Sequence, residues 1–127
     1  MTIKIQVEKV TEEVEIGSSV YTLDLSDEKI EEKLSFYDKF KNKVDKYEGV
    51  DIATVDAETR KEIMDDRKET VKEMLESLLG EGTFESVYND VGRSIVVMSN
   101  VIVQLTDVMK NRIAQINESS KSYYTGE

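Results

Sequence analysis

The segment from residue 57 to residue 79 carries apolar side chains at every third or fourth position and holds no glycine or proline. This spacing matches the turn of an α-helix, and it separates an apolar arc from an acidic arc. The apolar arc contains Ile63, Met64, Val71, Met74, Leu75, Leu78 and Leu79. The acidic arc contains Glu62, Asp65, Asp66, Glu69, Glu73 and Glu76. The sequence therefore predicts a long helix, capped by Asp56 and ended by Gly80-Glu81-Gly82, that packs by one side only.

Two further segments show the same helical spacing. The first begins after Ser26, a residue type that caps helix N-termini, and ends before Gly49. Its apolar face holds Ile30, Leu34, Tyr37, Phe40, Val44 and Tyr47. The second begins near Arg93, and its apolar stripe is formed by Ile95, Met98, Ile102, Leu105, Met109, Ile113 and Ile116. Between the acidic helix and this last one, residues 83–88 predict a short connecting helix that Gly92 ends.

The N-terminal region alternates with a period of two, which is typical of half-buried strands. Ile3, Ile5 and Val7 alternate with polar residues and predict a first extended segment. A second alternation turns at Gly17-Ser18-Ser19, which predicts a β-hairpin over residues 14–25. Two strands alone are marginal in water, so this hairpin should pack on the helices or on another subunit.

These elements define an α+β fold that is mainly α: an N-terminal β-hairpin followed by three main helices and a short connecting helix. A chain of 127 residues has the usual size of one domain, and we expect a single domain over residues 1–117. Residues 118–127 are polar and unpatterned, and we expect them to form a disordered tail.

Composition argues against most enzyme chemistry and against several kinds of partner. The chain has no cysteine and no histidine, so it lacks disulfides, thiolate ligands and the side chain best suited to proton transfer near neutral pH. Its net charge of −10 would repel nucleic acid and anionic membranes. No apolar run is long enough to cross a bilayer, and the N-terminus does not resemble a signal peptide, so we expect a cytoplasmic protein.

Two motifs that suggest chemistry have simpler explanations. Ser26 and Lys29 have the spacing of some serine acyl enzymes, but the other motifs of those enzymes are absent and Ser26 is well placed as a helix cap. The acids of the second helix share a face, but their segment lacks the glycine and ligand spacing of a calcium loop. We therefore expect no enzyme activity, no catalytic residue, no bound metal and no cofactor.

The last helix carries more apolar surface than one packed side requires. The residues that widen its stripe or lie opposite it are Val96, Val97, Val101, Val103 and Val108. One interpretation is a central helix covered by the other helices and the hairpin. The other is a surface for a partner or for a second copy, because so small a domain has few elements to cover every side. We take these five valines as candidate partner-binding residues and expect a homo-oligomer.

The order of elements and two stretches of sequence resemble the tail assembly chaperones of long-tailed (siphovirus-type) bacteriophages and prophages. The stretches are Gly17-Ser18-Ser19-Val20-Tyr21-Thr22-Leu23-Asp24-Leu25-Ser26-Asp27-Glu28 and Leu78-Leu79-Gly80-Glu81-Gly82-Thr83-Phe84-Glu85-Ser86-Val87-Tyr88. The family consists of small acidic proteins with an N-terminal hairpin, a capped helix, a second acidic helix and an apolar last helix. The likeness in layout covers nearly the whole chain.

The resemblance implies a protein that binds the tape measure protein in the host cytoplasm, keeps this long helical chain soluble and helps recruit tail tube subunits. It also implies that the protein is absent from the mature virion. The family has no catalytic residues, so the resemblance assigns none to this chain. The alternative is a small acidic helical adaptor of a mobile element or host, without enzymatic role.

Overall fold

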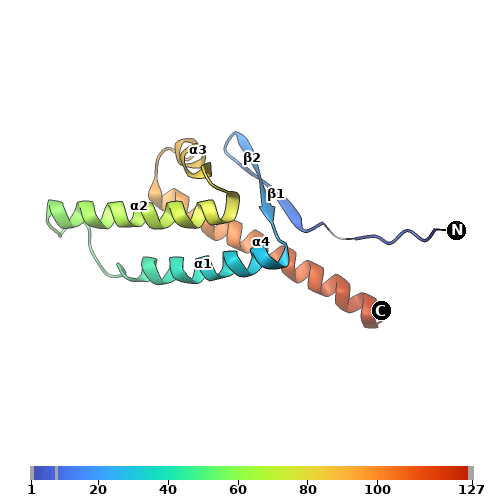
Figure 1. The fold of residues 1–127 in the computed structure, drawn as a ribbon. Coiled ribbons are helices and arrows are strands. Elements are labelled where there is room, and N and C mark those ends of the chain that lie inside the picture. The colour runs from blue at the N-terminus through green and yellow to red at the C-terminus, as the bar shows by residue number, and fades with distance from the viewer. Residues whose placement is uncertain (1, 8, 126–127) are drawn as a thin grey trace.

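The structure is a computed structural model that describes the backbone of residues 2–7 and 9–125 and, except at 116 and 119–125, their side chains. Its elements are β1 (Thr11–Ile16), β2 (Ser19–Asp24), α1 (Asp27–Asp45), α2 (Ala57–Leu79), α3 (Thr83–Asp90) and α4 (Ile95–Thr125). The mainly helical α+β fold with an N-terminal hairpin, three main helices and a short connecting helix is therefore confirmed (Figure 1).

Helix α2 is the element on which the others pack. It contacts α1, α3, α4 and β2 (Figure 1). The side of α2 that the spacing predicts to be apolar supplies Ile63, Val71, Met74, Leu75 and Leu78 to the interior. From α4, Met98, Ile102, Leu105 and Met109 meet this side, and Phe84 and Val87 of α3 close one end of the same core. Burial of these side chains is the main source of stability in a domain without disulfides.

The hairpin is antiparallel and turns through Gly17 and Ser18, with Ile16 opposite Ser19. Gly17 has a φ of 59°, and a Cβ at this position would lie 2.7 Å from Cβ of Asp90 in α3. Glycine is therefore required both for the turn and for the close approach to α3. The Tyr21 hydroxyl and Ser86 Oγ, 2.8 Å apart, form a second link between the hairpin and α3.

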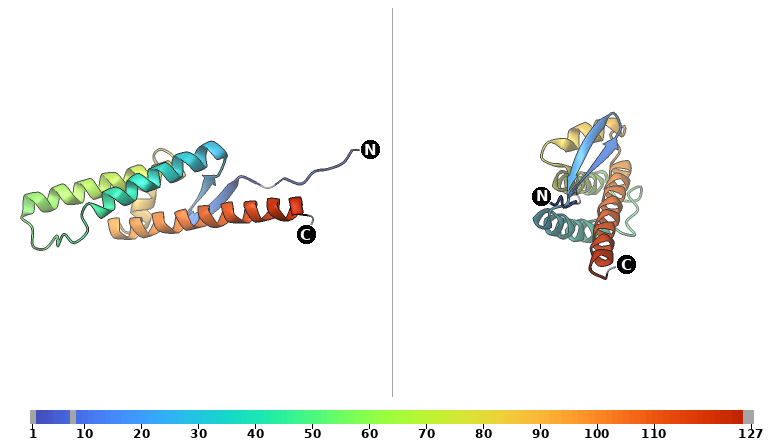
Figure 2. Two further views of the ribbon diagram at one scale, coloured as in Figure 1. Left: turned by 90° about the horizontal axis from the view of Figure 1, so that it is seen from below. Right: turned by 90° about the vertical axis from the view of Figure 1, so that its right-hand side faces the viewer.

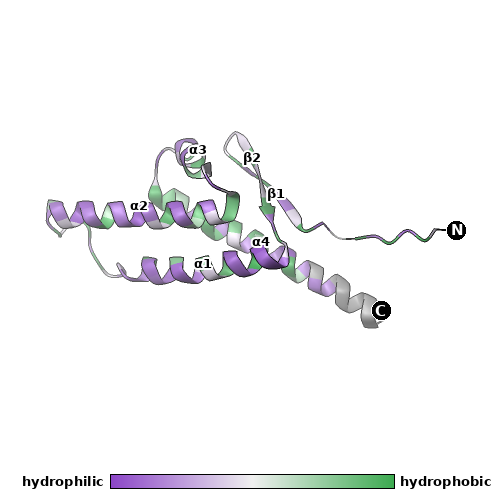
Figure 3. Cartoon of the chain, viewed as in Figure 1, coloured by the Kyte–Doolittle hydropathy of each residue, from purple (hydrophilic) through white to green (hydrophobic). Residues whose placement is uncertain are grey.

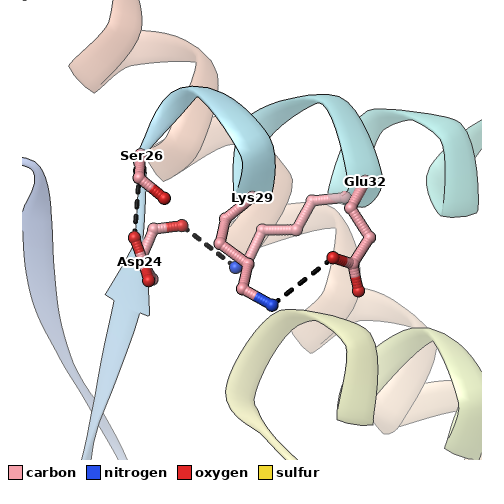
Figure 4. A network of polar contacts seen from close by, with 5 residues as sticks. Asp24, Ser26, Lys29 and Glu32 are labelled. Carbon is pink, nitrogen blue, oxygen red and sulfur yellow. Dashed lines mark hydrogen bonds and ion pairs between the residues drawn. The ribbon is translucent and has the colours of Figure 1, made fainter.

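A small polar network joins the end of β2 to the start of α1 (Figure 4). Ser26 occupies the N-cap position of α1 as predicted, but its side chain accepts no capping hydrogen bond. Instead, the Ser26 N–H donates to Asp24 Oδ1, and this hydrogen bond lowers the pKa of Asp24. Lys33 is buried, and its Nζ donates to the backbone carbonyl of Asp24 at 3.0 Å. Desolvation lowers the pKa of Lys33, and the nearby charge of Asp24 opposes that shift.

The second helix has the ends that the sequence predicts. Asp56 accepts a hydrogen bond from Thr59 N at the first turn, and Gly80 ends the helix with a φ of 111°. Glu76 adds a contact that spacing alone does not reveal, because its carboxylate accepts hydrogen bonds from the backbone N–H groups of Gly82 and Phe84 at 2.9 and 3.5 Å. A carboxylate at this place satisfies free donors at the N-terminal end of α3.

Helix α4 begins at Ile95, two residues after the predicted start near Arg93. Gly92 and Arg93 both have positive φ angles, of 76° and 58°, so neither can belong to a right-handed helix. The Arg93 N–H donates to the carbonyl of Tyr88, and its guanidinium lies 4.6 Å from the centroid of the Tyr88 ring. These contacts hold a sharp change of direction between α3 and α4.

Three expectations differ from the structure or lie partly outside it. The segment Thr2–Val7 forms no strand, and Ile3, Ile5 and Val7 are exposed instead of half-buried. A strand needs a hydrogen-bonded neighbour, and β1 pairs with β2 alone in the described part of the chain.

The side chain of Ile116 is outside the described residues. Helix α4 runs to Thr125, into the predicted tail, while the division of the chain at residue 117 stays a prediction.

Met64 also departs from the expected pattern. It lies in the predicted apolar arc of α2, yet it is 45 % exposed because neither α1 nor α4 covers that part of the helix. Leu75, three turns further along the same arc, is completely buried.

We expect this contrast to appear in stability. Leu75→Ala should lower the free energy of unfolding by about 2–5 kcal/mol, because it leaves a cavity among side chains that cannot close around it. Met64→Ala should cost less than about 1 kcal/mol. Urea denaturation followed by circular dichroism measures both. Equal losses would contradict the arrangement of the core around α2.

Candidate partner-binding surface

The five candidate valines of α4 differ in exposure. Val96 is the most exposed at 73 %, followed by Val103 at 44 % and Val97 at 41 %. Val101 and Val108 are half-buried against the core. Thus none of the five is part of the fully buried interior, and each retains accessible apolar surface.

The five valines do not form one continuous patch. With about 100° of rotation per residue, Val96 and Val103 fall on one side of α4, and Val97, Val101 and Val108 on the other. The buried stripe of Met98, Ile102, Leu105 and Met109 separates the two groups on the inner side of the helix. The chain therefore offers two distinct surfaces, one on each flank of α4.

The first surface is a groove of about 260 Å³ between α1, α2 and the start of α4, which we call the helix groove. Each of the three helices contributes one well-exposed apolar side chain to it: Val44, Met64 and Val96. Its remaining lining residues are Lys43, Tyr47, Arg67, Thr70, Val71, Ile95, Ser99 and Asn100. Hydrophobic residues gather on the first part of α4, whereas α1 and α2 are mostly hydrophilic outside (Figure 3).

Tyr47 fixes one wall of the helix groove. Its hydroxyl donates a hydrogen bond to Asp66 Oδ2 on α2, so it ties the segment after α1 to the neighbouring helix. The Arg67 guanidinium lies 5.7 Å from the centroid of its ring. The hydrogen bond to Asp66, helped by desolvation, raises the pKa of Tyr47.

The charges on the helix groove differ from those of the protein as a whole. Among the described residues its lining includes two bases, Lys43 and Arg67, and no acid. Lys43 forms an ion pair with Glu73 at 3.5 Å, and both side chains are about half exposed. The groove is therefore an apolar surface with a basic edge on an otherwise acidic molecule.

The second surface is a groove of about 470 Å³ between β1 and the other flank of α4, which we call the hairpin groove. Val14 and Ile16 line it from the hairpin, and Val101, Leu105 and Val108 from α4. Glu15, Gly17, Val91 and Gln104 complete its lining. Two of the five candidate valines thus face the hairpin, and one faces the helix groove.

The prediction from the last helix alone missed the residues that the other helices contribute. Val44 and Met64 were assigned to the packed faces of their helices, where the spacing places them. Periodicity identifies the apolar side of each helix but not which positions on that side a neighbour covers. The one indication of such a surface in the sequence was that the last helix carries more apolar surface than its neighbours can cover.

The other motifs show ordinary structural roles. Lys29 Nζ pairs with Glu32 Oε2 at 3.4 Å on the surface of α1, next to the N-cap residue Ser26 (Figure 4). The described residues contain no group of three or more acidic side chains arranged to hold a metal ion. In the described part of the chain no single helix is long and apolar enough to span a membrane, and only the pair Thr83–Asp90 and Ile95–Gln115, bent by 113°, reaches that length and composition together.

Comparisons of the chain with protein-family models, with curated proteins and with solved structures give no match.

The wall of the helix groove can be tested by titration. The difference in ultraviolet absorbance between wild type and Tyr47→Phe isolates the ionisation of Tyr47, which we expect above the usual tyrosine pKa of about 10. Asp66→Asn should shift this difference curve to lower pH, because it removes the charged acceptor that favours the protonated phenol. The stability that this hydrogen bond contributes should be present below about pH 10 and lost as the pH rises through the pKa of the folded state. A curve that is the same with and without Asp66 would mean that the two side chains do not interact.

Proposed function

We propose that this protein is a tail assembly chaperone of a long-tailed bacteriophage or prophage, which holds helical segments of the tape measure protein in its helix groove. The observation that carries this proposal is an open apolar groove made by three helices, in a chain whose order of elements resembles that family. In the proposed role the protein works in the host cytoplasm, helps to recruit tail tube subunits and does not remain in the virion.

The form of the helix groove suits an amphipathic helix. Such a helix presents apolar side chains every three or four residues, and it binds by laying this stripe into a groove. Val44, Met64 and Val96 surround the space from three directions, so they can contact a stripe along its length. All three side chains are already exposed in the unbound protein, and covering them would contribute favourable free energy without any core rearrangement.

The helix groove and the rest of the surface differ in charge, and each has its own role in this proposal. Lys43 and Arg67 favour a client segment with acidic residues beside its apolar stripe. The net charge of −10 produces repulsion between complexes, which opposes aggregation while the long client is incomplete. The outward acids of α2, among them Glu62, Asp65 and Glu69, are exposed and supply much of that charge.

Co-expression with the tape measure protein encoded in the same genome tests the function directly. We expect the client to move from the insoluble to the soluble fraction and to copurify with the chaperone. If the tape measure protein is equally insoluble with and without this chain, the chaperone role is wrong and the adaptor alternative gains support.

Two neighbouring valines provide a matched pair of variants for the same assay. Val96→Asp places a charge in the helix groove, and we expect at least a tenfold loss of client captured. Val97→Asp makes the same change one residue away, on the side of α4 that faces away from the groove, and should keep capture near the wild-type level. Both side chains are exposed, so both variants should retain the helical circular dichroism. Equal losses in the two variants would contradict binding in the helix groove.

Charge reversal on α2 separates apolar from electrostatic recognition. Glu69→Lys with Glu73→Lys should leave most client capture intact, since exposed charges contribute little to affinity, but should lower solubility and change the salt dependence. If this variant loses the client while Val96→Asp keeps it, the acidic side of α2 is the binding surface instead.

A further inference from the structure

The N-terminal arm, Thr2–Val7, carries the most exposed run of apolar side chains in the described chain. Ile3, Ile5 and Val7 are exposed by 79, 75 and 84 %. They alternate with Lys4 and Gln6, so in an extended conformation all three lie on one side. β-branched residues at this period are typical of a strand with one buried face, yet nothing in the structure buries this face.

The arm points away from the body of its own chain. The Lys9 carbonyl accepts a hydrogen bond from Arg112 Nη2 at 3.0 Å, and the Val10 carbonyl accepts one from Leu25 N at 2.6 Å. These two contacts fix the chain where it enters β1. From there the arm extends beyond the hairpin and away from α2 (Figure 1 and the left view of Figure 2).

The hairpin groove offers a free strand edge and an apolar lining, which the arm does not find elsewhere in the described part of its own chain. The sheet beside this groove contains β1 and β2 alone in the described residues, so one edge of β1 has no strand beside it. Next to that strand, Val14 and Ile16 of the hairpin and Val101 and Val108 of α4 line an open apolar space of about 470 Å³. An unpaired strand edge next to an apolar groove is a template for strand addition.

The side chains of the arm and those of β1 are also complementary in charge and in apolar character. Along β1, the half-buried Val14 and Ile16 alternate with the exposed acids Glu13 and Glu15. A strand added to β1 with its apolar side toward the groove puts Lys4 on the face that carries these acids. Opposite charges on adjacent strands attract, and apolar pairs on the other face bury each other.

We propose that the N-terminal arm of one copy binds the hairpin groove of a second copy by adding a strand to β1. Two copies can exchange arms reciprocally, which closes a twofold dimer in which each groove is filled once. The site lies on the flank of α4 opposite Val96, so the dimer leaves the helix groove free. The inference rests on the arm and the hairpin groove and not on the identity of the client.

Sedimentation tests whether the arm carries the association. Wild type should be a dimer at about 50 µM, and Ile3→Ser with Ile5→Ser and Val7→Ser should be a monomer with unchanged circular dichroism, because the arm is not part of the folded core. The matched control changes the alternate positions, Thr2→Ser with Gln6→Ser, and should remain a dimer. A monomeric wild type, or an apolar variant that associates as strongly as wild type, would overturn the proposal.

Disulfide trapping tests where the arm binds and whether it comes from another copy. The natural chain has no cysteine, so introduced cysteines are the only ones present. A tagged Ile5→Cys chain mixed with an untagged Val108→Cys chain should give a mixed disulfide dimer. Val103→Cys, on the other flank of α4, should give at least five times less of this product. Equal yields with the two partners, or an Ile5→Cys, Val108→Cys double variant that closes only within one chain, would show that the arm does not bind this groove of a second copy.

Discussion

Burial of one side of α2 is the interaction on which the rest of the structure depends. Helices α1, α3 and α4 and strand β2 all pack against this helix, and Met74 and Leu75 in its C-terminal third are almost completely inaccessible. A hairpin of two strands would not be stable alone, and α3 has only eight residues. Each of these elements is therefore ordered because it covers part of the same apolar surface.

The same arrangement explains why grooves remain. Helices α1 and α4 both pack on α2, and they approach each other near Tyr37, where Lys110 Nζ lies 5.4 Å from the ring centroid. At the other end of α1 the two helices leave Val44, Met64 and Val96 uncovered around the helix groove. On the other flank of α4, the hairpin groove remains between β1 and the side chains of Val101 and Val108. A domain with so few elements can bury its central helix, α2, but it leaves both flanks of its longest helix, α4, partly uncovered.

Much of the fold could be predicted because local signals and packing agree. The cap at Asp56, the end at Gly80 and the turn at Gly17 each follow from a residue type whose backbone preference fits its place. The strand predicted for Ile3, Ile5 and Val7 was wrong within this chain because alternation describes a strand's faces and does not supply a neighbour for its backbone. The buried Lys33 left no signal either, since its burial depends on the carbonyl of Asp24 nine residues earlier.

By itself the sequence determined which segments are helices or hairpin, which side of each is apolar, and that the last helix carries more apolar surface than one packed side needs. Those properties follow from the spacing of residues along one chain. Only the tertiary structure decided that Val44 and Met64 join Val96 in one groove, and that Val101 and Val108 face the hairpin. The physical reason is that a side chain's exposure depends on which neighbouring element covers it, and that coverage is set by the angles and distances at which α1, α4 and the hairpin meet α2.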